Sequence, residues 1–197
     1  MDDNTAFPWP QKGDQLFVAG DDWHNNAILN WTPDQWGLYS EGYKRAADIL
    51  VDYIINRYTD QDTLVYPIVY LYRQHLELVL KQLLHEADHF LGNKADLPTG
   101  HKIDGLWTQC RPLLIQIDSR IPTEDLDAVA ETIQQFCAVD PGSTAFRYPI
   151  AVGKVPAPSL PGLTQINLRN IAEVINRVSV FLEAARTEIY EWKSQGP

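Results

Sequence analysis

The histidines of one short segment have the spacing of a zinc site, and this is the first feature that could carry chemistry. The pattern His-Glu-x-x-His begins at His85, so that on a helix His85 and His89 lie one turn apart on the same face. Two such histidines can bind zinc, with Glu86 as the general base of a hydrolase. A longer motif with a third ligand is not matched, because Ala95 occupies that position and Asp96 lies one residue away. The other interpretation is a solvated helix end, and we therefore expect no metal and no cofactor.

Charged residues spaced four apart form a second candidate. Arg73, Glu77 and Lys81 fall on one face of the most apolar helical segment, where residues four apart are neighbours. Such pairs stabilise an exposed helix by a few tenths of a kcal/mol each. The spacing alone indicates a solvated face with ion pairs, and a ligand-binding group is the alternative.

Two further motifs could contribute to a binding site. His101 follows a glycine at the expected start of a helix, where a neutral histidine can act as a general base, a hydrogen-bond donor or a cap. Arg147 lies between Phe146 and Tyr148 in a proline-flanked loop. A guanidinium there can bind a phosphate or carboxylate through two hydrogen bonds, or it can form a structural salt bridge that ties the loop to the body.

The apolar residues recur with a period close to 3.6 and predict an all-α protein. Thr32, Pro33 and Asp34 fit the N-cap, the N1 position and the first turn of the first helix. Gly92 fits the end of the second helix, and Asn167 fits the N-cap of the last. We therefore expect an up-and-down bundle of four to five long helices, over residues 32–58, 63–91, 101–119, 122–138 and 167–192.

Two segments lack a long helical pattern. Residues 1–31 contain three tryptophans and predict an irregular arm with one short helix over 27–29. We expect this arm to pack on a single bundle domain formed by residues 32–197, because so many aromatic side chains favour burial. Residues 143–165 form a loop rich in proline and glycine, with a small hairpin expected over 146–155.

The overall composition limits the classes of function. A formal net charge of −10 over 197 residues repels phosphate backbones, so binding to DNA is not expected and contact with RNA needs a local basic patch. The N-terminus lacks the basic and apolar regions of a signal peptide, and no apolar run is long enough to cross a membrane. Cys110 and Cys137 fall in apolar helical patterns and are expected to be small core residues. These features predict a cytoplasmic protein without a membrane segment.

Three patches of the sequence resemble a known family. They are an Arg/His, Glu-Leu and Leu-Lys series, a Gly-His pair followed by Leu-Trp, and a Phe-Arg-Tyr-Pro run, found at residues 72–84, 100–107 and 146–149. In this order the patches are similar to those of bacterial HEPN-like proteins (higher eukaryotes and prokaryotes nucleotide-binding). The resemblance covers roughly residues 35–190 and leaves out the N-terminal arm.

The resemblance implies a helical bundle that often dimerises and that binds a nucleotide or RNA, in defence, toxin–antitoxin or stress systems. The residues that it would bring together are Arg73, Glu77, Lys81, His101, Arg147 and Tyr148. The catalytic motif of the RNase branch, an arginine followed after four to six residues by a histidine, does not occur, which argues against RNase activity. Two alternatives stay open: a buried polar network without a ligand, and a non-catalytic module that binds a protein partner or a second copy of itself.

Overall fold

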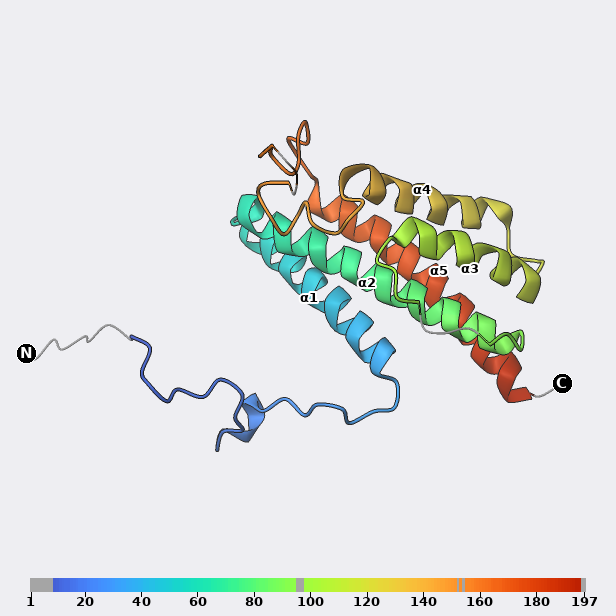
Figure 1. The fold of residues 1–197 in the computed structure, drawn as a ribbon, viewed down its shortest axis with the longest axis horizontal. Helices are drawn as coiled ribbons and strands as arrows, with labels where there is room; N and C mark the ends of the chain where they lie inside the picture. The colour runs from blue at the N-terminus through green and yellow to red at the C-terminus, as the bar shows by residue number, and fades with distance from the viewer. Residues whose placement is uncertain (1–8, 95–97, 152, 154, 196–197) are drawn as a thin grey trace, which may run out of the picture. The chain divides into compact units, whose positions relative to one another are not determined.

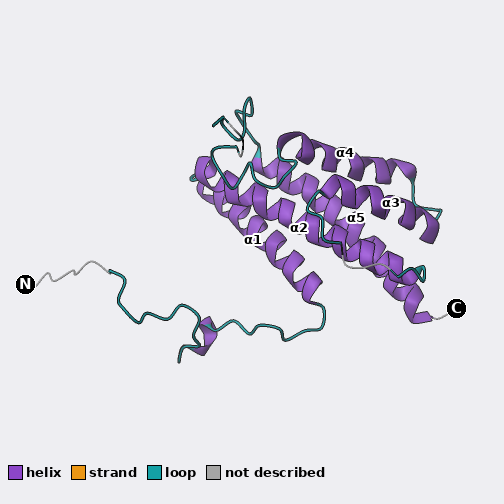
Figure 2. Cartoon of the chain, viewed as in Figure 1, coloured by secondary structure: helices purple, strands orange, loops and turns teal. Residues whose placement is uncertain are grey.

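The computed structural model describes residues 9–94, 98–151, 153 and 155–195, and all regular elements in this part of the chain are helical (Figure 2). The chain divides into two compact units, Met1–Pro33 and Asp34–Pro197. The second unit is a bundle of five helices (Figure 1). This confirms the predicted all-α bundle. The first unit ends two residues later than the predicted arm, and its packing on the bundle stays a prediction.

Helix α2 (Gln61–Phe90) is the centre of the bundle. Helices α1 (Gln35–Arg57), α3 (Ile103–Ile117) and α5 (Leu168–Gln195) pack against it, and α4 (Thr123–Val139) packs against α3 and α5. At 1.5 Å per residue, α2 is about 45 Å long, which lets one helix contact three neighbours along its length. Its apolar core residues recur every one to four positions and are Ile68, Val69, Tyr72, Leu76, Val79, Leu80, Leu83, Leu84 and Ala87.

The N-terminus of α1 corrects the predicted cap. Asp34, and not Thr32, is the N-cap residue, and its side chain accepts a hydrogen bond of 2.8 Å from the backbone N–H of Gly37. A carboxylate in this position satisfies a helix N–H that has no partner within the helix, and it interacts favourably with the helix dipole. Gly37 is required for this arrangement, because a Cβ there would collide with the Asp34 carboxylate.

The boundaries of α2 and α3 lie within two residues of those expected. Helix α2 begins at Gln61, two residues early, and stops before Gly92, whose φ of 75° is the left-handed value that glycine adopts readily at helix ends. Helix α3 begins at Ile103, so that His101 lies in the preceding loop and not at the first turn. His101 is therefore free to approach α2 instead of capping its own helix.

The last helix begins as the sequence predicts. The side chain of Asn167 accepts a hydrogen bond from a backbone N–H in the first turn of α5, as predicted.

The short helix expected over 27–29 is instead a 3₁₀ turn at Trp23–Asn25. The reason is local hydrogen bonding, because the Asn26 amide pairs with both the N–H and the C=O of Gly20 and closes a turn there.

The loop between α4 and α5 contains an isolated antiparallel bridge where a hairpin was expected. The bridge joins Ile150 and Pro158, so the pairing begins inside the predicted segment 146–155 and ends beyond it. Proline has no backbone N–H and cannot extend a strand ladder, which explains why the pairing stays short. Residues 152 and 154 of this segment lie outside the described residues.

The two cysteines are free thiols and agree with their prediction as core residues. Cys110 is fully buried and Cys137 is half-buried. Burial raises the pKa of the Cys110 thiol to about 12, so the thiol stays protonated and unreactive at neutral pH. In the part of the chain that the structure describes, no helix combines the length and the apolar character needed to cross a membrane.

Candidate functional site

A buried polar cluster on α2 brings together four of the six predicted site residues. Arg73, Glu77 and Lys81 lie along one face of α2, and His101 reaches them from the loop before α3. Arg73 and Glu77 are only 1% and 2% exposed. The interpretation of this stripe as a solvated helix face was therefore wrong, because the loops before α3 and after α4 cover it. We call these four residues the Arg73 cluster.

Arg73 joins three segments of the chain. Its Nη1 donates to Glu77 Oε2 at 3.3 Å, and its Nη2 donates to the backbone carbonyl of His101 at 3.0 Å. Its Nε donates to the carbonyl of Asp140, at the C-terminal end of α4, at 3.4 Å. Every guanidinium nitrogen thus has a protein partner. The main role of Arg73 is to hold the surrounding segments in place, which leaves it little capacity to bind a ligand.

The Glu77 carboxylate is the centre of the cluster. Its Oε1 accepts hydrogen bonds from Lys81 Nζ at 2.9 Å and from His101 Nδ1 at 2.8 Å. Burial disfavours the ionised form, but the hydrogen bonds from Lys81 and His101 outweigh it and hold the pKa of Glu77 below its ordinary value. The carboxylate is therefore ionised at neutral pH and compensates the buried cations around it.

His101 is the exposed member of the cluster. Its side chain is 76% exposed, although Nδ1 is bonded to the buried Glu77. A carboxylate that accepts from Nδ1–H fixes the tautomer of a neutral imidazole and leaves the lone pair on Nε2. The backbone of His101 is held as well, through the bond from Arg73 to its carbonyl. The result is an oriented imidazole with its acceptor nitrogen at the surface.

Arg147 and Tyr148 lie in the loop between α4 and α5, and Arg147 lies over Tyr70, which precedes the Arg73 cluster on α2. The Arg147 guanidinium is 5.5 Å from the ring centroid of Tyr70 and 5.4 Å from that of Tyr148, within the range of cation–π attraction. Its Nε donates to the carbonyl of Ser143 at 2.5 Å, and the side chain stays exposed. Among the described residues Arg147 has no carboxylate partner. The alternative of a structural salt bridge is therefore not what the structure shows.

The two exposed groups occupy opposite ends of one strip of α2. Arg147 lies over Tyr70, and His101 is bonded to Glu77, about two helical turns later. A rise of 1.5 Å per residue separates these positions by about 10 Å along the helix. The structure therefore places His101 and Arg147 on the same side of α2 without bringing them into contact.

Sequence reasoning missed the part played by Asp140. This residue is 2% exposed, its carbonyl accepts from Arg73, and its carboxylate accepts from the backbone N–H of Thr144 at 2.7 Å. An aspartate followed by proline and glycine signals a turn, and the side-chain bond to Thr144 is typical of such turns. The bond from Arg73 spans 67 residues and has no local signal.

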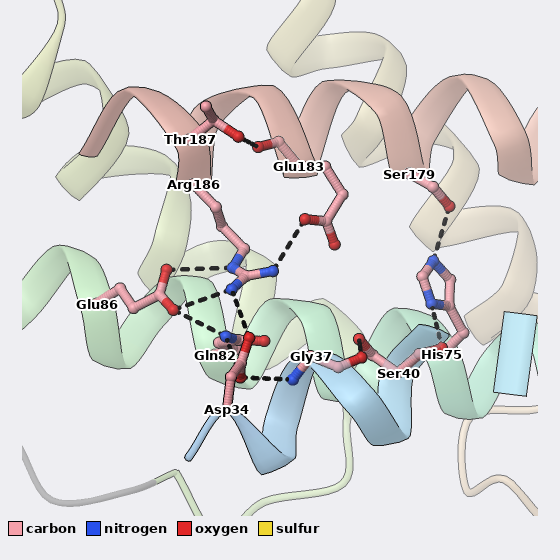
Figure 3. A network of polar contacts seen from close by, with 10 residues as sticks. All are labelled: Asp34, Gly37, Ser40, His75, Gln82, Glu86, Ser179, Glu183, Arg186 and Thr187. Atoms are coloured by element: carbon pink, nitrogen blue, oxygen red, sulfur yellow. Dashed lines mark hydrogen bonds and ion pairs between the residues drawn. The ribbon is translucent and has the colours of Figure 1, made fainter. Parts of the chain in front are cut away.

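The zinc-like segment is engaged in an ion pair. Glu86 accepts two hydrogen bonds from Arg186 of α5, each of 3.1 Å (Figure 3), so the residue expected to act as general base is held by a guanidinium. His85 and His89 are exposed near the end of α2. Within the described residues, no group of three or more histidine, cysteine, aspartate or glutamate side chains could hold a metal ion. The position of the third ligand, at 95–96, lies outside them.

Arg186 organises a second polar network, between α1, α2 and α5 (Figure 3). Its Nη1 donates to Glu183 at 2.9 Å, and its Nη2 lies 3.9 Å from the Asp34 carboxylate. The Gln82 amide donates to both Asp34 and Glu86. These bonds connect the N-cap of α1 to α2 and α5. The network therefore fixes the packing of three helices and gives Glu86 a structural role.

His75 forms a second junction between the same helices (Figure 3). Its Nδ1 donates to the carbonyl of Ser40 in α1 at 2.9 Å, and its Nε2 lies 2.7 Å from the hydroxyl of Ser179 in α5. Burial lowers the pKa of His75 below its ordinary value, so the ring is neutral at neutral pH. With Nδ1 protonated, Nε2 is an acceptor for the single hydroxyl proton of Ser179, for which the Ile175 carbonyl, 2.8 Å from the same hydroxyl oxygen, competes.

Fold and site together define an acidic helical bundle in which a buried ionic cluster orients an exposed histidine. No family model matches the chain, and comparisons with curated proteins and with solved structures found no similar protein.

Proposed function

We propose that this protein binds the phosphate groups of a nucleotide or of RNA along the strip between His101 and Arg147, as a HEPN-like bundle without RNase activity. The observation that carries the proposal is that both side chains are exposed yet fixed by their neighbours. Side chains fixed in advance lose little entropy on binding, which increases affinity. In this reading Arg73, Glu77 and Lys81 form the buried support of the site.

The exposed groups suit an anionic ligand with an aromatic base. Among the described contacts, only Nε of Arg147 is bonded to protein, which leaves both terminal nitrogens to donate to a phosphate in the forked geometry that arginine favours. The ring of Tyr148 is 52% exposed and offers a face on which a base could stack. The exposed imidazole of His101 offers Nε2 at the other end of the strip for a polar contact with the ligand.

The span of the strip and the net charge favour a small ligand. A single phosphate cannot reach both ends of a strip about 10 Å long, whereas a nucleotide or a short piece of RNA can place different groups at each end. The formal net charge of −10 repels a long polyanion that extends past the strip. The strip is therefore best suited to nucleotides and short oligonucleotides.

A protein partner is the second candidate, and a specific feature of α1 supports it. Tyr39, Ile49 and Tyr53 lie on one side of this helix at helical spacing and are 57%, 57% and 43% exposed. Exposed apolar side chains gathered on one face are typical of interaction surfaces. This face belongs to α1 and is distinct from the strip between His101 and Arg147.

The test is a thermal-shift and calorimetry panel with nucleotides and short RNA. A ligand at about a hundred times its dissociation constant stabilises the folded state by about 2.7 kcal/mol, which raises the Tm by several degrees. We expect this shift to be lost in Arg147→Ala and reduced in His101→Ala. Arg177→Ala is the matched control, because Arg177 is an exposed arginine on α5. Ligand binding that is equal in Arg147→Ala and wild type would contradict the proposal, and a panel without any shift would favour the protein partner.

A further inference from the structure

The His101–Glu77 pair has the geometry of an activated nucleophile. Nδ1 lies 2.8 Å from a carboxylate oxygen that is itself buried, while the rest of the imidazole is in solvent. A bond from Nδ1–H to a carboxylate concentrates the lone pair on Nε2 and stabilises the positive charge that develops when Nε2 attacks an electrophile. The buried carboxylate therefore both orients the imidazole and increases the nucleophilicity of Nε2.

Glu77 is well suited to this task because its environment holds it in place. Three donors surround the carboxylate, with Lys81 and His101 on Oε1 and Arg73 on Oε2. A carboxylate anchored by two buried cations cannot rotate away from the imidazole when the ring becomes charged. The bond from Arg73 to the His101 carbonyl fixes the backbone that carries the ring. Both halves of the pair are therefore positioned before any reaction begins.

The surrounding charges select the type of electrophile. The side chain of Lys81 meets the same carboxylate oxygen as the imidazole, and Lys102, the residue after His101, is exposed. Cations close to a nucleophile attract an anionic electrophile and stabilise the charge on its oxygens in the transition state. Phosphoryl groups fit this description, since they carry negative oxygens on an atom that a histidine nitrogen can attack.

The other histidines provide an internal comparison. His85 and His89 are exposed on α2, but within the described part of the chain neither is bonded to a carboxylate. The ring of His24 contacts that of Trp23 at a tilted angle, and His75 is buried with both ring nitrogens occupied. His101 combines an exposed ring with a buried carboxylate partner, whereas His85 and His89 are exposed without one. Comparing the reactivity of the three histidines therefore separates the effect of the Glu77 carboxylate from the effect of exposure.

We infer that His101 accepts a phosphoryl group on Nε2 from small donors of the phosphoramidate or acyl phosphate class. The Nε2 lone pair forms the new N–P bond, while the P–N or P–O bond of the donor breaks and its electron pair leaves with ammonia or a carboxylate. The imidazole becomes positively charged beside Glu77 and then releases its Nδ1 proton to solvent. The inference shares His101 with the proposed function but does not depend on nucleotide binding.

The first experiment treats the full-length protein with potassium phosphoramidate and, in a second arm, with acetyl phosphate. Phosphorylated sites are mapped by mass spectrometry under conditions that preserve the P–N bond, and phosphorus NMR distinguishes Nε2 from Nδ1 adducts. We expect Nε2 phosphorylation of His101 at a rate roughly tenfold or more above that of His85 and His89. Modification in one arm and not the other would identify the donor class. Equal labelling of the three histidines, labelling of His101 on Nδ1, or no labelling in either arm would overturn the inference.

A variant series separates activation from folding. Glu77→Gln keeps an oxygen that can accept from Nδ1 but removes the negative charge, and we expect it to slow the labelling of His101 by roughly tenfold. His85→Ala is the matched control and should label His101 at the wild-type rate. Circular dichroism checks that each variant is folded, and the wild-type rate ratio between His101 and His85 decides the question if Glu77→Gln does not fold. A folded Glu77→Gln that labels at the wild-type rate would also contradict the inference.

Discussion

Replacing Arg73 with methionine should destabilise the region around the candidate site more than any substitution at the surface does. Methionine fills much of the same space but cannot donate to Glu77, to the His101 carbonyl or to the Asp140 carbonyl. The loop before α3 and the end of α4 would then lose their common attachment to α2. The buried Glu77 would keep only Lys81 and His101 as partners.

The expected loss of stability follows from the burial of the pair. Arg73 and Glu77 have side chains that are 1% and 3% exposed, so solvent cannot replace the missing guanidinium. Removing one partner of a buried ion pair costs about 3–5 kcal/mol, because the other charge stays buried. For a chain of this size each kcal/mol corresponds to about 2–4 °C in Tm, which predicts a decrease of roughly 6–20 °C.

The assay is thermal and urea unfolding followed by circular dichroism at neutral pH, on Arg73→Met, Glu77→Gln and the double variant. If the cost arises from the uncompensated Glu77 charge, Glu77→Gln should cost less in the Arg73→Met background than in the wild type, with a coupling free energy of about 0.5–3 kcal/mol. The reasoning would be refuted if Arg73→Met unfolded within about 2 °C of the wild type, or if the two substitutions were additive.

Three further outcomes are expected from the structure. Gly37→Ala should destabilise the protein by about 0.5–2 kcal/mol in urea unfolding, because its Cβ displaces the Asp34 cap, whereas Gly42→Ala, with open space around it, should be neutral or stabilising. The pKa of His75 is lowered from 6.5, so below this pH the unfolded chain binds a proton at His75 more readily than the folded chain does. The free energy of unfolding should therefore be highest above about pH 6.5 and decrease with falling pH, by up to about 1.4 kcal/mol per pH unit. His75→Gln should reduce this pH dependence. Glu86→Gln should lower stability by about 2 kcal/mol in urea unfolding, because glutamine keeps one acceptor oxygen but loses the other and the charge that pairs with Arg186. Stabilisation of the wild type by added zinc that is lost in His85→Ala would instead restore the metal hypothesis.

The fold could be predicted from the sequence because it depends on local patterns. The apolar period of 3.6 located all five helices of the bundle, and Gly92 and Asn167 marked a helix end and a helix start through their own backbone and side-chain chemistry. The cap of α1 was assigned to Thr32 because the Thr-Pro pair fits the start of a helix. The deciding factor was Gly37, which leaves room for the Asp34 carboxylate.

The candidate site was only partly predictable, for a physical reason. The stripe of Arg73, Glu77 and Lys81 is visible in the sequence, but its burial depends on loops from two other parts of the chain. The same spacing would describe an exposed face. Likewise Glu86 looks like a catalytic base in its local motif, and only Arg186, a hundred residues later, shows that it forms an ion pair. Long-range partners decide between these alternatives, and no local pattern contains them.

The central position of α2 has a consequence for how the protein folds. Helices α1 and α2 are joined by three residues, so the contacts between them close over short loops. The bonds from α5, by contrast, join His75 to Ser179 and Glu86 to Arg186 across 104 and 100 residues. Because contacts at large sequence separation form slowly, we expect the α1–α2 hairpin to be structured in the folding transition state and α5 to dock after it. The charged network of Arg186 would then mainly slow unfolding, and so set the lifetime of the native state more than the speed at which it forms.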